Sequence, residues 1–455
     1  MTRSSQAPRP SLWSRASSVA ARTPETRNRL VDFLRAVSIL AVISGHWLLA
    51  APYVGGGGLR LANMLETEPW TQWLTWGFQV MPIFFLVGGY SNAVSWKAAM
   101  RDGRSYADWL SARLQRLIGP VLPLLVAWAV LGTAAGQLGV PAPMVQVGSQ
   151  MALVPIWFLA VYMLVVVLVP ITFAAWRRWG FGSFLILAAA AIVDDALFFA
   201  ADFRVVGWAN YLFVWLAVHQ LGYAWFDGRL AAPKARLLCG VAGLGALIGL
   251  VTIGPHPLSM ISVPGEAVSN TLPPKLAMLA LGIAQTGLLL AMEQPLRRWL
   301  ARSVPWTVTV LLNGMIMTVY LWHLTAAALV MGLAILLGNV GLSQEPGTAA
   351  WWLGRPVWLI VYVVALAGLA LLLGRFERGS GELRPVAPWR QVAGALLVCG
   401  GLAMLALNGV GADGWLKLQI WALLLPFIGA WLAGLLPVDT LWRPGEGAPS
   451  SAAER

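Results

Sequence analysis

The amino-acid sequence predicts an all-α, polytopic membrane helix bundle of about twelve transmembrane helices, and three observations carry this prediction. Of the 455 residues, 58% are hydrophobic and only 11% are charged, whereas a soluble domain has about 25% charged residues. The mean hydropathy of +0.71 excludes a disordered chain, because disorder requires low hydrophobicity. The chain also contains 25 tryptophans, a residue that is enriched at membrane–water interfaces.

Apolar runs of about 20 residues are long enough to cross a hydrocarbon core of about 30 Å. The fifth such run is interrupted by Asp194 and Asp195 and gives the weakest prediction of a span. The ninth is too long for one straight crossing at about 1.5 Å per residue, so we expect it to tilt or to continue outside the bilayer beyond Gly332. The twelve predicted spans lie at about 30–50, 72–96, 116–136, 151–174, 182–201, 205–226, 236–254, 272–293, 305–337, 356–374, 390–409 and 415–437.

The loops between these spans alternate in charge. One set of alternate loops, together with both chain ends, holds 25 of the 31 lysines and arginines. The positive-inside rule places this set in the cytoplasm, which predicts a multi-pass protein of the plasma membrane with both termini cytoplasmic. The net charge of +12 therefore follows membrane topology, and no nucleic-acid partner is expected.

The two ends of the chain differ from the spans in composition. Residues 1–28 and 443–455 show no hydrophobic periodicity, so we expect two disordered cytoplasmic tails. The first span follows a basic start, as a signal peptide does, but Asp32, Arg35 and His46 lie within it. A cleaved apolar segment rarely carries such residues, so the span is predicted to be retained.

Ionisable residues within spans are functional candidates, because burying them in lipid is costly. Arg35 and His46 are eleven residues apart in the first span, which places them on nearly one helix face and about 16 Å apart along the axis. Counted from Leu30, His46 lies about 24 Å across the membrane. Asp32 and Arg35 are three residues apart and can form an ion pair.

A second histidine is expected at the same depth. His323 in the ninth span lies about 26 Å from Trp306, on a span that runs in the same direction as the first. Histidine takes or gives a proton near neutral pH, as the activation of a hydroxyl nucleophile requires; the alternative for each is an interfacial residue satisfied by a neighbouring helix. For His219 we expect a helix-packing role, and for His256, in an outer loop, a solvated position.

The loop before the third span contributes a pair of arginines. Arg113 and Arg116 are one helical turn apart and face the same way. Two guanidinium groups at this spacing can bind phosphate oxygens through paired hydrogen bonds. The alternative is that they only set the orientation of the span. Cys239 and Cys399 lie in apolar runs, so neither a disulfide framework nor a metal site is implied.

Taken together, these residues resemble the integral-membrane acyltransferase family called acyltransferase type three, over about residues 28–375. Two departures from the family stand out: Gly88 replaces the serine that the family usually has in its second-span motif, with Ser91 nearby, and the last two spans extend a ten-span core. The implied division of the chain is 1–28, a tail; 29–375, the acyltransferase membrane domain; 376–442, two additional helices; and 443–455, a tail. The motifs that carry the resemblance are Arg35 and His46, Arg113-Leu-Gln-Arg116, Val31–Ser38, Pro82–Phe85, Trp157–Leu159 and Tyr320–His323.

The resemblance implies a membrane O-acyltransferase. Its donor would be cytoplasmic acyl-CoA, acetyl-CoA by default, and its acceptor a hydroxyl of an extracytoplasmic or lipid-linked glycan or another small acceptor, with no metal. Arg113, Arg116 and Arg35 would hold the coenzyme A phosphates, and the thioester arm would extend toward His46.

Two chemical routes for the acyl transfer are open. His46 would act as general base or carry the acyl group covalently, while His323 or Tyr320 would orient it or stabilise the oxyanion. A twelve-span transporter is the alternative function, although the two halves show no similarity. Outward-facing candidates for binding the acceptor are Glu66, Glu68, Trp70, Asp194, Asp195 and Asp202.

Overall fold

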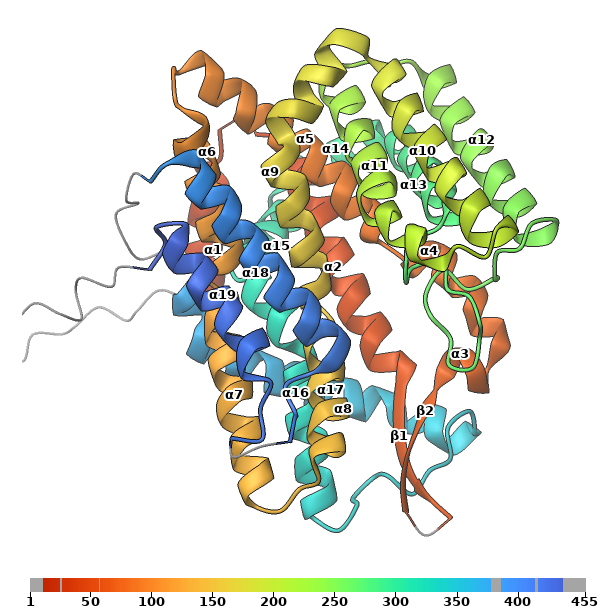
Figure 1. Ribbon diagram of the computed structural model, residues 1–455, viewed down its shortest axis with the longest axis vertical. Coiled ribbons are helices and arrows are strands. Elements are labelled where there is room, and N and C mark those ends of the chain that lie inside the picture. Colours follow the sequence, from red (N-terminus) through yellow and green to blue (C-terminus); the bar gives the residue numbers. More distant parts are fainter. Residues whose placement is uncertain (1–10, 25–26, 57, 378–385, 414–415, 437–455) are drawn as a thin grey trace, which may run out of the picture.

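The computed structural model describes residues 11–24, 27–56, 58–377, 386–413 and 416–436, and it confirms the predicted all-α helix bundle (Figure 1). The only sheet in these ranges is the antiparallel hairpin of β1 (Ala50–Gly55) and β2 (Gly58–Asn63). The helices on the predicted spans are α2 (Arg29–Leu49), α5 (Met81–Arg101), α7 (Val121–Gln137), α9 (Ile156–Trp179), α10 (Phe181–Ala200), α11 (Asn210–Phe226), α12 (Pro233–Thr252), α13 (Leu276–Ala291), α15 (Ser303–Asn313) with α16 (Ile316–Leu336), α17 (Ala349–Leu373), α18 (Pro388–Asn408) and α19 (Ile420–Leu432).

Shorter elements connect these helices. They include α6 (Tyr106–Ile118), α8 (Ala142–Leu153) and α14 (Glu293–Leu300), and between β2 and α5 the segments α3 (Met64–Thr67), η1 (Pro69–Leu74) and α4 (Thr75–Phe78). Two further 3₁₀ segments are η2 (Arg204–Ala209) and η3 (Gly374–Glu377). Within the described residues, eight helices or continuous helical segments are long and apolar enough to cross a membrane, or nine if the bent pair α13 and α14 forms one span. The polytopic class is thereby shown, while the count of twelve spans stays a prediction.

The structure adds to one expectation about a single element and corrects another. The ninth predicted span, expected to tilt or to continue beyond Gly332, divides at Gly314 and Met315 into α15 and α16, and α16 runs to Leu336. The N-terminal tail is not wholly disordered, since Leu12–Ala21 form α1, which packs against α15. The Nε1–H of Trp306 in α15 donates to Thr23 Oγ1 at 3.2 Å just after α1. The predicted C-terminal tail, 443–455, lies outside the described residues.

The helix packing brings distant segments of the chain together around α2 and α9. Helix α5 crosses α11 so closely that a Cβ at Gly89 or Gly222 would meet the backbone of the other helix, the small-residue packing expected where backbones touch. Helix α18 packs against α9, α8 and α6, and α19 packs against α18 (Figure 1). The two C-terminal helices therefore extend the core of the bundle.

Candidate active site

The two histidines that the sequence places at one depth are in direct contact. His46 lies in the last turn of α2 and His323 in the first half of α16. His46 Nδ1 is 2.9 Å from His323 Nε2, and the two rings are nearly parallel. The Nε1–H of Trp47 donates to the His323 backbone carbonyl at 3.0 Å, which fixes α2 against α16 at this point.

The hydrogen bonds fix which ring nitrogen carries each proton. His323 Nδ1 is 2.6 Å from the Tyr320 carbonyl oxygen, and a carbonyl can only accept, so His323 Nδ1 carries a hydrogen. In the neutral rings, His323 Nε2 then accepts from His46 Nδ1–H, and His46 Nε2 keeps a free lone pair. Among the described residues no group hydrogen-bonds to His46 Nε2, so this nitrogen is available as a base or nucleophile.

Tyr320 acts through its backbone in this arrangement. Its phenolic hydroxyl donates to the Pro155 carbonyl oxygen at 2.8 Å, so the one hydroxyl proton is used away from His46. Its carbonyl oxygen, by contrast, holds His323. The geometry therefore favours orientation of His323 over a hydrogen bond from the Tyr320 hydroxyl to an oxyanion.

His46 lines a cavity of about 890 Å³ at its end of the bundle. Its walls include parts of α2, η1, α4, α9, α16, α18 and the loop between α12 and α13. The residues that line it are mostly apolar, and no aspartate, glutamate, lysine or arginine is among them in the described part of the chain. The cavity can therefore present an uncharged, weakly polar molecule to the free nitrogen of His46.

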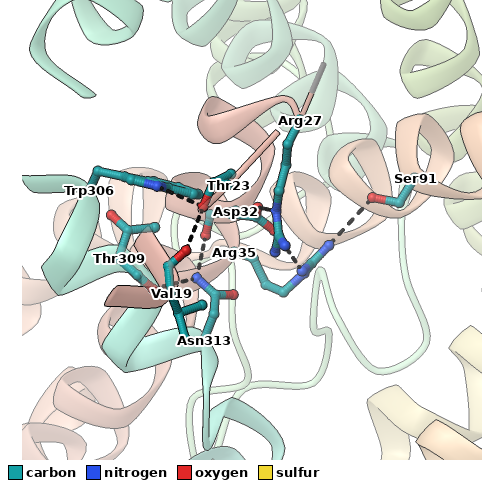
Figure 2. A network of polar contacts seen from close by, with 9 residues as sticks. All are labelled: Val19, Thr23, Arg27, Asp32, Arg35, Ser91, Trp306, Thr309 and Asn313. Carbon is teal, nitrogen blue, oxygen red and sulfur yellow. Dashed lines mark hydrogen bonds and ion pairs between the residues drawn. The ribbon is translucent and has the colours of Figure 1, made fainter. Parts of the chain in front are cut away.

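Arg35 lies three turns of α2 away from His46, in the polar network of Figure 2. Its guanidinium contacts the Asp32 carboxylate at 3.2 Å, as the spacing predicts, and donates to Ser91 Oγ at 3.4 Å. Asp32 also accepts from Arg27 Nε at 2.6 Å, and its backbone carbonyl accepts from Asn313 Nδ2 at 3.0 Å (Figure 2). Ser91, the serine nearest to the replaced family position, thus contacts the first-span arginine.

Helix α6 positions the arginine pair beside Arg35. A capping box starts this helix, because Ser105 Oγ accepts from the Asp108 N–H and the Asp108 carboxylate accepts from the Ser105 N–H. Arg113 lies within electrostatic range of Arg35 and Arg116. In the described part of the chain neither Arg113 nor Arg116 pairs with a carboxylate, so their charges are free to attract an anion.

A packed row of aromatic rings separates the arginines from the cavity. Tyr320 contacts Phe158 at 6.0 Å between ring centroids, and Phe158 contacts Tyr162 at 5.6 Å. Tyr162 in turn lies within electrostatic range of Arg113. None of Arg35, Arg113 and Arg116 lines the cavity that holds His46. The structure therefore brings the two histidines together and places Arg35 and Arg116 near Arg113, with a series of ring contacts between Arg113 and Tyr320, which lines the cavity.

Two of the acceptor-binding candidates are buried instead of facing outward, and this corrects the prediction. Asp195 accepts hydrogen bonds from Asn210 Nδ2 at 3.0 Å and from the Leu276 N–H at 2.6 Å, and it lies 3.1 Å from His256 Nε2. His256 is thus buried, not solvated. Asp194 is buried beside it, so this cluster ties α10, α11 and α13 to the loop between α12 and α13.

Other candidates have different environments. Trp70 lines the cavity and donates from Nε1 to Glu68 at 3.0 Å, while Asp202 pairs with Arg204 at 2.8 Å and Glu66 is exposed. His219 is buried in α11 with its Nε2 3.1 Å from Asn92 Nδ2, which fits helix packing. The described residues contain no group of three or more His, Cys, Asp or Glu side chains that could hold a metal.

A nearby lysine is buried as well. Lys275, at the start of α13, lies over the Phe198 ring and donates to the Pro273 carbonyl oxygen. Lys275 also lies within electrostatic range of Asp195 and Asp194. The lysine therefore contributes a compensating positive charge to the buried carboxylates.

Sequence reasoning missed the residues that support the histidines and the cavity. The Trp47 indole N–H and the Pro155 backbone carbonyl contact the site, and contacts of this kind leave no spacing pattern in the sequence. The contribution of α18 to the cavity wall is also invisible in the sequence, because α18 is more than 300 residues from His46 along the chain. The only sequence feature that could have indicated this contribution is the apolar stripe of α18.

Comparison with known protein families agrees with these features. The family model described as the acyltransferase domain matches residues 28–375. The chain therefore belongs to the acyltransferase type three family of membrane O-acyltransferases. The comparisons with curated proteins and with solved structures give no match. Helices α18 and α19 lie beyond the matched residues.

Proposed function

We propose that this protein transfers an acyl group, acetyl by default, from cytoplasmic acyl-CoA to a hydroxyl of an extracytoplasmic or lipid-linked glycan or other small acceptor. One observation carries the proposal: the contact from Tyr320 through His323 leaves Nε2 of His46 free in a cavity. Family membership supports acyl transfer over transport. The charge alternation of the loops supports a plasma-membrane protein with its arginine-rich end in the cytoplasm.

In this proposal Arg113, Arg116 and Arg35 bind the phosphates of coenzyme A. Their support is the clustering of three guanidinium groups, of which only Arg35 has a carboxylate partner among the described residues. Guanidinium groups bind phosphate in a bidentate manner. The thioester arm then has to pass the rings of Phe158 and Tyr162, so these rings must move aside when the donor binds.

The chemistry at His46 follows one of two balanced routes. As general base, Nε2 accepts the hydroxyl proton while the acceptor oxygen attacks the thioester carbonyl; the C–S bond breaks, and the proton on Nε2 passes to the departing thiolate of coenzyme A. As nucleophile, Nε2 itself displaces the thiolate and becomes an acyl-imidazolium; the acceptor hydroxyl then attacks the acyl carbon, the C–N bond to Nε2 breaks, and the hydroxyl proton goes to the thiolate of coenzyme A. In both routes the positive charge that forms on His46 is shared with His323 through their hydrogen bond.

The first test removes the imidazole. His46→Ala should lower acyl transfer by about 10²-fold or more, because base catalysis alone supplies about 10²–10⁴-fold. The readout is mass spectrometry of envelope glycans and lipids from cells that express the wild type, the variant or neither. Thermal unfolding of the purified variant serves as the folding control, and full transfer by a folded His46→Ala protein would reject the role of His46.

The second test concerns the donor. Coenzyme A should raise the melting temperature of the wild type more than pantetheine, which lacks the nucleotide phosphates. Arg113→Gln with Arg116→Gln should abolish this difference. Arg177→Gln with Arg178→Gln, a pair of exposed arginines at the end of α9, is the matched control. Equal protection of both double variants by coenzyme A would show that Arg113 and Arg116 do not bind it.

A further inference from the structure

The cavity beside His46 has an apolar mouth. Large hydrophobic side chains that line it are also exposed, among them Trp70 (57%), Phe78 (51%) and Leu396 (51%). Its polar lining side chains, such as Gln79 and Gln150, are uncharged. An exposed apolar rim of this kind marks a surface that lipid can cover, so the cavity is accessible to molecules that reside in the bilayer.

One wall of this cavity is built by α18, which lies outside the residues matched by the family. The residues that α18 contributes recur at helical spacing and form a single face. Most of them are small, and a Cβ built at Gly400 would have no heavy atom within 4 Å. The small side chains keep this part of the cavity open. The wall consists of Leu396, Cys399, Gly400, Ala403, Ala406 and Leu407.

The donor site is elsewhere. The arginines proposed to bind coenzyme A lie beyond Phe158 and Tyr162 and do not line the cavity. A donor bound there reaches the cavity only with its thioester arm, so the rest of the cavity is available to the acceptor. A soluble, strongly polar acceptor would leave most of its hydrogen-bonding groups unpaired against these walls, which is costly.

We propose that the cavity binds the hydrocarbon chain of an amphipathic acceptor that enters sideways from the bilayer, with α18 as the wall that accommodates the chain. The chain then holds the hydroxyl-bearing head group of the acceptor next to Nε2 of His46. This inference rests on the proposed function, and it narrows the acceptor to a lipid or a lipid-linked sugar. It also gives the C-terminal extension of the family domain a role in substrate selection.

The test measures chain binding separately from catalysis. The probe is decyl β-D-glucoside with a photoreactive diazirine at the end of its alkyl chain, and the comparison probe is the ethyl glucoside with the same group. Irradiation of the protein in liposomes, followed by peptide mass spectrometry, should give labelling of 396–407 by the decyl probe. This labelling should be saturable, competed by plain decyl glucoside, and absent with the ethyl probe.

Matched variants locate the chain. Gly400→Leu fills the cavity and should reduce the saturable labelling about tenfold, in line with the free energy of burying several methylenes. Gly368→Leu is the control, because Gly368 in α17 is also exposed and has no heavy atom within 4 Å of a built Cβ, but does not line the cavity. Labelling that does not saturate, or that Gly368→Leu reduces equally, would overturn the proposal.

Two further experiments distinguish a failure of the proposed catalytic role of His46 from a failure of the chain-binding proposal. His46→Ala should keep the saturable labelling, so loss of acyl transfer with labelling intact would concern the catalytic role alone. Acyl transfer with acetyl-CoA and decanoyl-CoA tests the other source of a hydrocarbon chain. If Gly400→Leu impaired only the use of decanoyl-CoA and left labelling by decyl glucoside unchanged, the cavity would bind the acyl chain of the donor and the proposal would be wrong.

Discussion

Gly88 stands where the acyltransferase family usually has a serine, and the ring of Tyr162 occupies the space that a serine side chain would need. A Cβ at Gly88 would lie within 3 Å of the Tyr162 ring and hydroxyl. The missing serine is therefore coupled to a ring in the aromatic row between the arginines and His46. The hydroxyl of Tyr162 accepts from Asn92 Nδ2 at 3.3 Å, which holds the ring in this position.

We predict that Gly88→Ser destabilises the protein by about 1–3 kcal/mol, the usual cost of overpacking a buried site. Because the clash involves the ring itself, Tyr162→Leu should rescue the Gly88→Ser variant, whereas Tyr162→Phe should not. The melting temperatures of the single and double variants measure this coupling. Equal rescue by Tyr162→Phe would mean that the hydroxyl, and not the ring, causes the conflict.

At the same scale, the sequence predicts some side chains well and others not at all. The equal depth of His46 and His323 in the membrane could be predicted because the rise per residue of a helix is fixed. Their contact follows from this equal depth on neighbouring helices. The contact between His256 and Asp195 could not be predicted, because His256 lies in the loop between α12 and α13, which has no such periodicity. The tautomers of the two active-site histidines depend on the Tyr320 carbonyl, which only the folded backbone places.

At the scale of single elements, the arginine pair depends on how α6 begins and ends. The capping box of Ser105 and Asp108 fixes its start. At its end the backbone of Gly119 and Pro120 stays helical and leads into α7, although proline has no N–H to donate to the preceding turn. The motif and its helical spacing were evident in the sequence. The division of the ninth span at Gly314 and Met315 was not, because the sequence is apolar on both sides of the break.

We predict that Ser105→Ala weakens α6 by about 1 kcal/mol, the usual effect of losing a helix cap. The Michaelis constant for acyl-CoA should rise as a result, because the first turn of α6 supports the turn that carries Arg113. Ser105→Asn is the control, since asparagine caps helices as well as serine does. Steady-state kinetics with both variants measure this effect. An unchanged Michaelis constant for Ser105→Ala would show that the helix cap does not influence donor binding.

At the scale of the whole molecule, the core of the bundle extends past the end of the family domain. The prediction of a ten-span core with two further helices rests on the positions of the motifs and the hydrophobic runs. The docking of α18 on α9 could not be predicted, because both helices present apolar faces to several possible neighbours. In the structure α18 contributes to the cavity on one face and packs against α19 on another.

Two adjacent glycines of α18 lie on these two different faces of the helix. A Cβ at Gly400 meets open space, whereas a Cβ at Gly401 would collide with Pro426 and the Ala422 carbonyl in α19. Gly401→Leu should therefore lower the melting temperature by forcing α18 and α19 apart, at a cost of about 1–3 kcal/mol or more. Gly400→Leu should leave the melting temperature unchanged or raise it, because leucine favours helix over glycine. Thermal unfolding of the two variants side by side measures this difference, and equal destabilisation by both would show that α18 lacks a face open to the cavity.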